Sequence, residues 1–330
     1  MKLPTSLKLA GATAAALATH ALLAEVALNE QFAISGYVVG SASYSKIQSV
    51  DSDSNADLDA TKLTAVAKFA PLTVTTSLFA FGTGSGDGFN NSPVFLDAYG
   101  TYDLGNGSSV TAGKYLSWLG YEAFDIPNML QITYANPTAA FIPAYHTGVK
   151  FENSTDAYAI GVGISDSLYG PAYYKGDGDL DNGVGLEAYF TYKAIKDFTL
   201  FAGLGYDTGD TADNKHFVAD LWAQYVYGQF TFAGEVCYGS TDYKDAGNED
   251  GFFVLGLVKY QVDEKWAATF RLSAGQGEAG DDFVRGTFAP TYAVTKNLDL
   301  VAEYSYTDYD KNVVGADYGH YLGLQARFKF

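Results

Sequence analysis

Charged side chains recur at every second position along many short segments of this 330-residue chain. Side chains two residues apart in a β-strand lie on the same face, so these charges would line one surface of a sheet. Walls and rings of charge tune which ions pass through a channel. If the sheet closes around water, this alternation places the following residues on its inner, water-facing side: Lys68, Asp97, Lys150, Glu187, Asp220, Glu235, Arg271, Arg285, Glu303 and Arg327.

Two of these charges lie on neighbouring predicted strands at about the same height, namely Arg271 and Arg285. Glu122 and Asp125 belong to a long predicted loop, residues 119–142. If the two arginines faced these acids across the narrowest part of a channel, the four groups would produce an electric field across that channel. Local pairing of Arg285 with Glu303 on the next strand accounts for the same residues without such a field. The sequence leaves both interpretations open.

Two acidic segments, 51–59 and 177–183, carry oxygen ligands at alternate positions, as calcium-binding loops do. In the second segment the candidate ligands are Asp177, Asp179 and Asp181. Its twelfth position is Ala188 where an EF-hand has glutamate, so the motif is incomplete. A solvated acidic rim is the simpler interpretation. We therefore expect no cofactor, with weak calcium binding as the alternative.

Few residues could support catalysis. Beyond the first 24 residues the histidines are His146, His216 and His320, and the alternation puts His320 on the apolar face. A hydrolase would need a nucleophile or paired carboxylates beside one of the other two. We expect no enzyme. If the strands of this chain close into a barrel around a lumen, two alternatives to an open channel remain: a barrel hydrolase, and a structural or adhesive barrel with a closed lumen.

The elements that would position these residues are strands. The chain has 26 Tyr, 22 Phe and 36 Gly but only 8 Pro, and aromatic residues favour strands while glycine favours turns. From Gln31 onward, alternating segments of about ten residues are separated by breaks that are alternately short and long. Short turns are predicted at 70–72, 104–108, 153–156, 194–197, 227–229, 261–265 and 293–297. Long loops are predicted at 46–60, 83–93, 119–142, 167–183, 208–215, 241–250, 276–282 and 309–316.

These breaks predict about 16 antiparallel strands, with an error of one hairpin in either direction. In the last segment Leu322, Leu324 and Phe328 alternate with polar side chains, which indicates one apolar face. Large aromatics lie near the ends of that face, as in the girdles of transmembrane barrels. Near the turns these are Phe69, Tyr192, Phe198, Trp266, Phe328 and Phe330; near the loops they are Tyr44, Tyr206, Tyr238, Tyr306 and Tyr318.

In lipid every backbone group must be paired within the protein, so such strands must close. The sequence thus predicts an all-β fold over residues 25–330: a closed antiparallel transmembrane β-barrel with short periplasmic turns and long external loops. Small residues dominate the inner face, which suits a watery lumen.

Residues 1–24 have a different composition. Lys2 and Lys8 precede the apolar run Leu9–Ala24, the pattern of a secretory signal peptide. The single Cys237 cannot form an internal disulfide. The net charge of −18 argues against nucleic acid as a partner, because phosphate binding requires basic residues. We expect export to a bacterial outer membrane.

The break at 119–142 is rich in apolar residues, unlike the other long loops. A loop exposed to water has no reason to be apolar. We expect this third loop to fold into the lumen and narrow it. A cap packed over the rim, or a contact between subunits, is the alternative.

Two stretches resemble known outer-membrane proteins. The ending Leu324–Phe330, with Phe328 and Phe330, resembles the C-terminal signal that the barrel insertion machinery reads. The segment Gly113–Glu122, followed by Pro127 and Asn128, is similar to a segment of the OmpL-like β-barrel porin family. Residues 129–135 depart from that pattern.

The resemblance implies a passive porin for small hydrophilic solutes or ions, with no catalytic residues. Its expected partners are outer-membrane lipid, the insertion machinery and the permeating solutes, with a homotrimer as a possible assembly.

Overall fold

The computed structural model describes residues 25–81, 94–122, 124–135, 142–169, 180–208, 214–245, 247–277, 282–309 and 316–330. Within these ranges the regular structure is almost entirely strand. The elements are β1 (Val26–Ala27), β2 (Phe32–Ile47), β3 (Asp53–Phe69), β4 (Leu72–Phe81), β5 (Val94–Gly105), β6 (Ser108–Leu116), η1 (Ile126–Asn128), β7 (Tyr145–Ser154), β8 (Tyr158–Ser165), η2 (Leu180–Asn182), β9 (Gly185–Tyr192), β10 (Phe198–Asp207), β11 (Lys215–Tyr227), β12 (Phe230–Tyr243), β13 (Gly247–Gln261), β14 (Trp266–Gln276), β15 (Asp282–Thr295), β16 (Leu298–Tyr309) and β17 (Tyr318–Lys329). No helix in the described ranges is long and apolar enough to cross a membrane.

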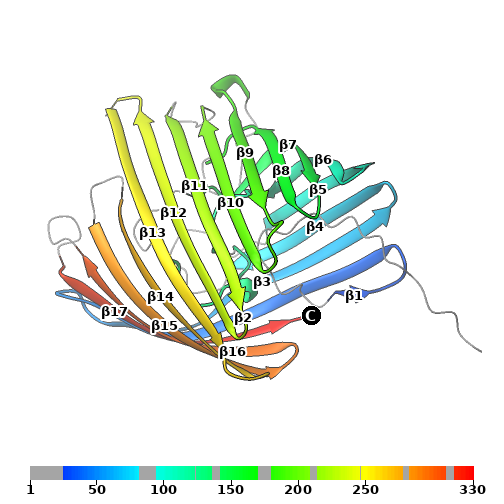
Figure 1. Ribbon diagram of the computed structural model, residues 1–330. Coiled ribbons are helices and arrows are strands. Elements are labelled where there is room, and N and C mark those ends of the chain that lie inside the picture. The colour runs from blue at the N-terminus through cyan, green and yellow to red at the C-terminus, as the bar shows by residue number, and fades with distance from the viewer. Residues whose placement is uncertain are drawn as a thin grey trace, which may run out of the picture.

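The strands from β2 to β17 form a closed antiparallel barrel (Figure 1). Each strand pairs with the next along the chain, and β17 pairs back onto β2 from Gly319–Ile47 to Lys329–Tyr37. The two-residue β1 only adds to the start of β2. Closure leaves no unpaired sheet edge, so the backbone is satisfied without water. The prediction of an all-β barrel with 16 strands is confirmed.

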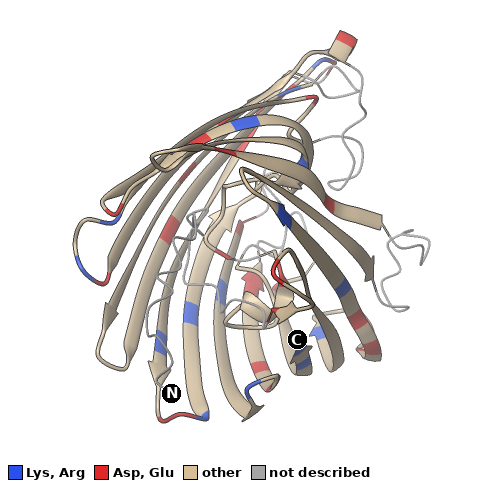
Figure 2. Cartoon of the chain, turned by 90° about the vertical axis from the view of Figure 1, so that its right-hand side faces the viewer, with Lys and Arg blue, Asp and Glu red and all other residues tan. Residues whose placement is uncertain are grey.

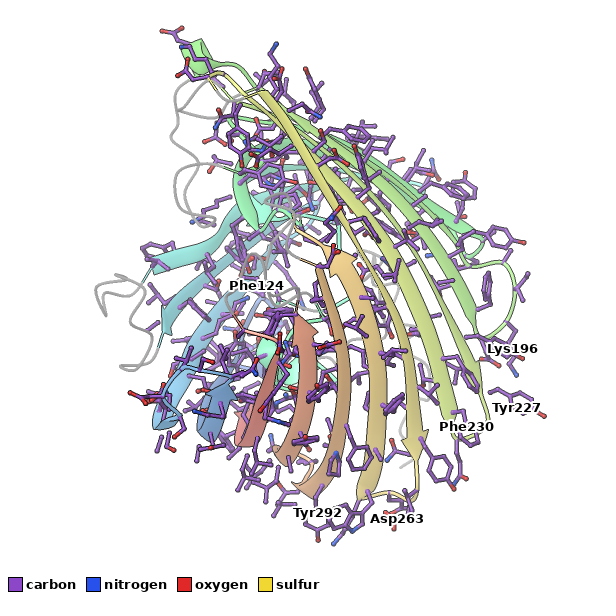
Figure 3. All side chains as sticks on the ribbon, turned by 90° about the vertical axis from the view of Figure 1, so that its left-hand side faces the viewer. Phe124, Lys196, Tyr227, Phe230, Asp263 and Tyr292 are labelled. Carbon is purple, nitrogen blue, oxygen red and sulfur yellow. The ribbon has the colours of Figure 1, made fainter. Side chains whose placement is uncertain are left out.

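The outer face of the barrel is apolar. On β17, Leu322 and Leu324 are each more than half exposed, whereas Gln325 and Arg327, on the other face, are buried. Figure 3 shows Tyr227, Phe230 and Tyr292 near the ends of strands joined by short turns. The residues predicted for the girdles include exposed aromatics at both levels, such as Phe69 and Trp266 near the turns and Tyr44, Tyr206 and Tyr306 near the loops. This exposed apolar surface is what a lipid environment requires.

The short turns occur where the alternation predicts them. Between β5 and β6, for example, Gly105, Asn106 and Gly107 all have positive φ. A Cβ on Gly107 would overlap the backbone carbonyl of Ser154, so both the conformation and the close approach require glycine there.

Two of the predicted long loops are wrong. Within 46–60 the connection is only residues 48–52, because β2 ends at Ile47 and β3 begins at Asp53. The segment 241–250 is a tight hairpin in which Tyr243 pairs with Gly247. β3 has 17 residues and β13 has 15, more than the roughly 9–11 residues that cross a bilayer. The polar residues that indicated loops are strand ends that extend past the lipid into water.

Several predicted features lie outside the described residues: the signal peptide 1–24, the whole loop at 83–93, residues 136–141 of the third loop, and the candidate calcium ligands Asp177 and Asp179. The third candidate ligand, Asp181, belongs to η2.

The interior of the barrel contains two apolar clusters. The larger includes inward residues of β9–β13, among them Phe201, Trp222 and Leu255, and the smaller lies on β2–β5 around Tyr37, Phe79 and Leu96. The expectation that small residues line a uniformly watery lumen is therefore wrong for these walls. Figure 2 shows described segments of chain inside the ring of strands. Residues of the third loop pack against both clusters.

Candidate functional site: the third loop against the inner wall

Residues 117–122 and 124–135 of the segment between β6 and β7, which contains the third loop, lie inside the barrel and contact opposite walls. Leu119 and Tyr121 pack in the larger apolar cluster, whereas Phe124 and Ile126 pack against the smaller one. Figure 3 labels Phe124 inside the ring of strands. The loop therefore crosses the lumen.

Inward carboxylates bind the first part of the loop through its backbone amides. Glu187 on β9, Asp220 on β11 and Glu235 on β12 are all buried. Glu187 Oε1 accepts hydrogen bonds from Ser117 Oγ and from the Trp118 amide, both at 2.7 Å. Asp220 Oδ2 accepts from the Gly120 amide at 2.8 Å, and Glu235 Oε1 accepts from the Tyr121 amide at 2.7 Å. These acids, predicted to line the pore, instead hold the loop.

The middle of the loop reaches the opposite wall through Asp125. Its carboxylate accepts from Lys62 Nζ on β3 at 3.0 Å and from Tyr37 Oη on β2 at 3.1 Å. Lys62 also pairs with Asp97 at 3.0 Å. Of the two interpretations left open by the sequence, the one in which Asp125 faces the two arginines is therefore wrong for this residue. Lys62 was missed, although it shares the inward parity of Lys68 and could have been found by extending the alternation.

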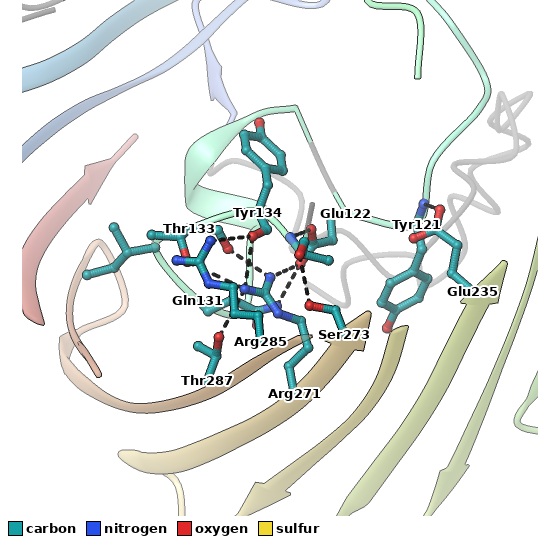
Figure 4. Close-up of polar contacts among 12 residues, drawn as sticks. Tyr121, Glu122, Gln131, Thr133, Tyr134, Glu235, Arg271, Ser273, Arg285 and Thr287 are labelled. Carbon is teal, nitrogen blue, oxygen red and sulfur yellow. Dashed lines mark hydrogen bonds and ion pairs between the residues drawn. The ribbon is translucent and has the colours of Figure 1, made fainter. Parts of the chain in front are cut away.

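The far end of the loop lies against β14–β17 (Figure 4). Arg271 donates to Glu122 and to the carbonyls of Thr133 (2.8 Å) and Tyr134 (3.1 Å). Glu303 accepts from the amides of Ile132 and Thr133. Glu122 therefore does face Arg271, but Glu303 binds the loop, and Arg285 donates to Ser305 Oγ at 2.9 Å.

Glycines on the wall make room for the loop. A Cβ on Gly203 of β10 would overlap Leu119 Cδ2, and one on Gly161 of β8 would stand 2.9 Å from Trp118 Cζ2. On the neighbouring wall, the Phe201 ring stacks on the Trp222 ring with centroids 5.2 Å apart. The Tyr121 ring contacts Trp222 edge-on, with centroids 5.5 Å apart. The small residues that indicated an open lumen thus accommodate side chains of the third loop.

Two other predicted lumen charges, Lys150 and Lys68, have partners away from residues 129–134. Lys150 on β7 lies over the Tyr115 and Trp118 rings, 4.6 Å from each centroid, and 3.7 Å from Glu152. Lys68 pairs with Glu25 at 3.3 Å, and both side chains are about half exposed.

The histidines have structural partners. His146 Nε2 lies 3.3 Å from Glu187 Oε2, and the same carboxylate accepts from Ser117 Oγ. A hydrolytic serine is activated by donating its proton to histidine, whereas Ser117 donates to a carboxylate. His216 Nδ1 lies 3.0 Å from Thr241 Oγ1.

Within the loop, burial raises the pKa of the Tyr121 hydroxyl above its usual range, and the charges of Glu122 and Glu235 add to the effect. The phenol therefore stays neutral. Its Oη lies 2.9 Å from Gln224 Oε1 and donates to it.

A closed barrel with an apolar outer face, a charged inner face and a third loop folded across the lumen defines a porin of the bacterial outer membrane. The family model described as "Putative beta-barrel porin-2, OmpL-like" matches residues 72–322, and the chain belongs to this family. A comparison with curated proteins gave no match.

Solved structures with the same fold include the anion-selective porin from Comamonas acidovorans, with a TM-score of 0.71, 12% identity, and coverage of 91% of this chain and 99% of that one. The outer membrane channel DcaP of Acinetobacter baumannii gives 0.65 at 15% identity, covering 91% and 97%. Salmonella typhi OmpF gives 0.64 at 15% identity, covering 92% and 100%. At this identity the likeness concerns the fold.

Proposed function

We propose that the protein forms a water-filled channel for passive diffusion of small hydrophilic solutes or ions, and that the third loop sets its narrowest section. The observation that carries the proposal is the attachment of this loop to opposite walls of the barrel, through Glu187, Asp220 and Glu235 on one side and Asp125 on the other. A loop fixed in this way gives the constriction a defined width.

We further propose a preference for cations, because the arginines of the lumen are more deeply buried than Asp125 of the third loop. The arginines Arg271, Arg285 and Arg327 are only 0%, 7% and 3% exposed. Asp125 is paired with Lys62, but its side chain is 24% exposed, against 5% for the lysine. Charge close to the permeating ion determines selectivity. The Comamonas porin is anion-selective by name, and the burial of the arginines supports the opposite preference here.

Planar-bilayer recording tests the function. Purified, refolded protein should produce stepwise conductance that is ohmic at low voltage, with a panel of salts and neutral sugars giving the size limit. Protein that inserts without conductance would support a closed structural or adhesive barrel. A screen with ester and peptide substrates tests the hydrolase alternative. Turnover that is present in wild type and lost in His146→Ala would favour a hydrolase.

Two further features belong to this proposal. Residues 1–24 are a signal peptide that directs export, and N-terminal sequencing of the mature protein checks the cleavage point. The channel assembles as a homotrimer, in line with the trimer form of Vibrio cholerae OmpT (14% identity, TM-score 0.61, coverage of 91% and 100%). The mass of the detergent-solubilised protein distinguishes trimer from monomer.

A further inference from the structure

The chain contains three arginines, and all of them project inward from the last strands of the barrel: Arg271 on β14, Arg285 on β15 and Arg327 on β17. All the other basic residues of the chain are lysines or histidines. Arginine alone offers a planar fork of donors that can hold two acceptors at once.

Each arginine uses its two terminal nitrogens on the same stretch of the third loop. Arg327 donates to the carbonyls of Met129 (2.6 Å) and Gln131 (2.9 Å). Arg271 donates to those of Thr133 and Tyr134. Arg285 donates to Thr133 Oγ1 (2.9 Å) and, more weakly, to the Tyr134 carbonyl (3.4 Å). Residues 129–134 are thus bound at nearly every position.

The lysine that holds the loop works differently. Lys62 pairs with a side-chain carboxylate, Asp125, where a point charge is sufficient. On residues 129–134 the arginines bind neutral acceptors, namely backbone carbonyls and the Thr133 hydroxyl, where the direction of each donor matters. Their guanidinium groups are covered, and Glu122 neutralises Arg271.

We propose that Arg271, Arg285 and Arg327 are positioning residues: together they clamp residues 129–134 to the wall and so fix the width of the pore, rather than forming a basic wall that attracts anions. The inference rests on the proposed channel function, but the clamp can be measured without conductance. The amides of Ile132, Thr133 and Ala135 are bonded to Glu303 and Glu122, so their hydrogen exchange reports whether this part of the loop is docked.

The decisive variants keep the charge and remove the fork: Arg271→Lys, Arg285→Lys and Arg327→Lys, singly and together. The matched control is Lys329→Arg. Lys329 lies on the same face of β17, two residues from Arg327, and pairs with Asp299 at 2.8 Å. The amides of Gly120 and Tyr121, bound by Asp220 and Glu235, are the internal reference.

In the lysine variants, exchange at Ile132, Thr133 and Ala135 should accelerate roughly 10- to 100-fold, the factor expected for losing a hydrogen bond to a charged group. Exchange at Gly120 and Tyr121 should not change, the channel current should become noisier, and the reversal potential should stay the same because the charge is kept. Lys329→Arg should match wild type in every measurement.

Three results would overturn the clamp. The first is wild-type exchange in the triple lysine variant together with altered selectivity on substitution of the same three residues by glutamine, which would show a basic wall. The second is equal acceleration at all five amides, which would mean that the arginines hold the barrel and not this segment. The third is rapid exchange of the three loop amides in wild type. Absence of conductance in wild type would contradict the channel but leave the exchange test intact.

Discussion

A charge placed on the middle of β17 tests whether its apolar face meets lipid. Leu324 lies just past the midpoint of this 12-residue strand. Its cross-strand neighbours are Ala302 on β16 and Ala42 on β2, so an arginine at 324 finds no acidic partner directly across either strand. Leu324→Arg should therefore be costly.

The magnitude follows from the position of the residue. Twelve residues extend over about 40 Å, and at a tilt of about 45° they span about 28 Å of the bilayer normal. Leu324 is thus close to the midplane, where an arginine costs about 2–4 kcal/mol. His320 lies four residues towards the outer rim, about 10 Å higher, and there the same substitution should cost about 0–1 kcal/mol.

Reversible urea unfolding in lipid vesicles, followed by tryptophan fluorescence, measures both costs. The midpoint should fall strongly for Leu324→Arg and little for His320→Arg, with unchanged slopes, since the slope follows the surface exposed on unfolding. Equal midpoints for Leu324→Arg and wild type would refute the assignment of this face to lipid.

Four further predictions follow from the same structure. Cysteines at Asn55 or Asn248 should react with an impermeant reagent on intact cells and those at Asn106 or Asn153 should not, with buried Cys237 silent in wild type; the reverse pattern would invert the orientation. Gly203→Val should displace Leu119 and raise conductance, whereas Gly256→Val, which has open space around it, should leave conductance unchanged. Reversal potentials should show cation preference near about 10 mM KCl that fades near about 1 M, because exposed charges are screened over about 3 Å at the higher concentration; anion preference at both would contradict the exposed acids. Calcium should leave the melting temperature nearly unchanged, and a rise removed by Asp181→Asn would establish a calcium site.

The strands and turns could be predicted because a transmembrane barrel has a strict period of two. Parity alone places Leu324 outside and Arg327 inside, and the structure agrees. Loop lengths were less predictable, because a strand that extends into water, such as the first residues of β3, has the composition of a loop. In β3, residues Asp53, Asn55 and Asp57 are spaced about 7 Å apart along an extended strand, so they do not curl around an ion.

The partners of the inward residues could not be predicted in the same way. Parity gives the face of Glu235 or Arg271 but not what covers that face, which depends on where the third loop runs. One signal was available: residues 252–258 of β13 form a continuous apolar run, the pattern of a strand buried on both faces. That run indicated that part of the inner wall is covered by apolar side chains and not by water.

The contacts of the third loop also bear on the order of folding. Its carbonyls at Met129 and Gln131 bind Arg327, 198 and 196 residues further along the chain, and its amide at Ile132 binds Glu303, 171 residues away. Contacts between such distant residues form slowly, because closing a long segment of chain costs entropy before the contact repays it. Docking of residues 129–134 therefore requires β14–β17 to be in place, whereas residues 117–121 bind strands β9–β12 that come earlier in the chain. The narrowing of the passage is completed only when the last strands of the barrel have formed.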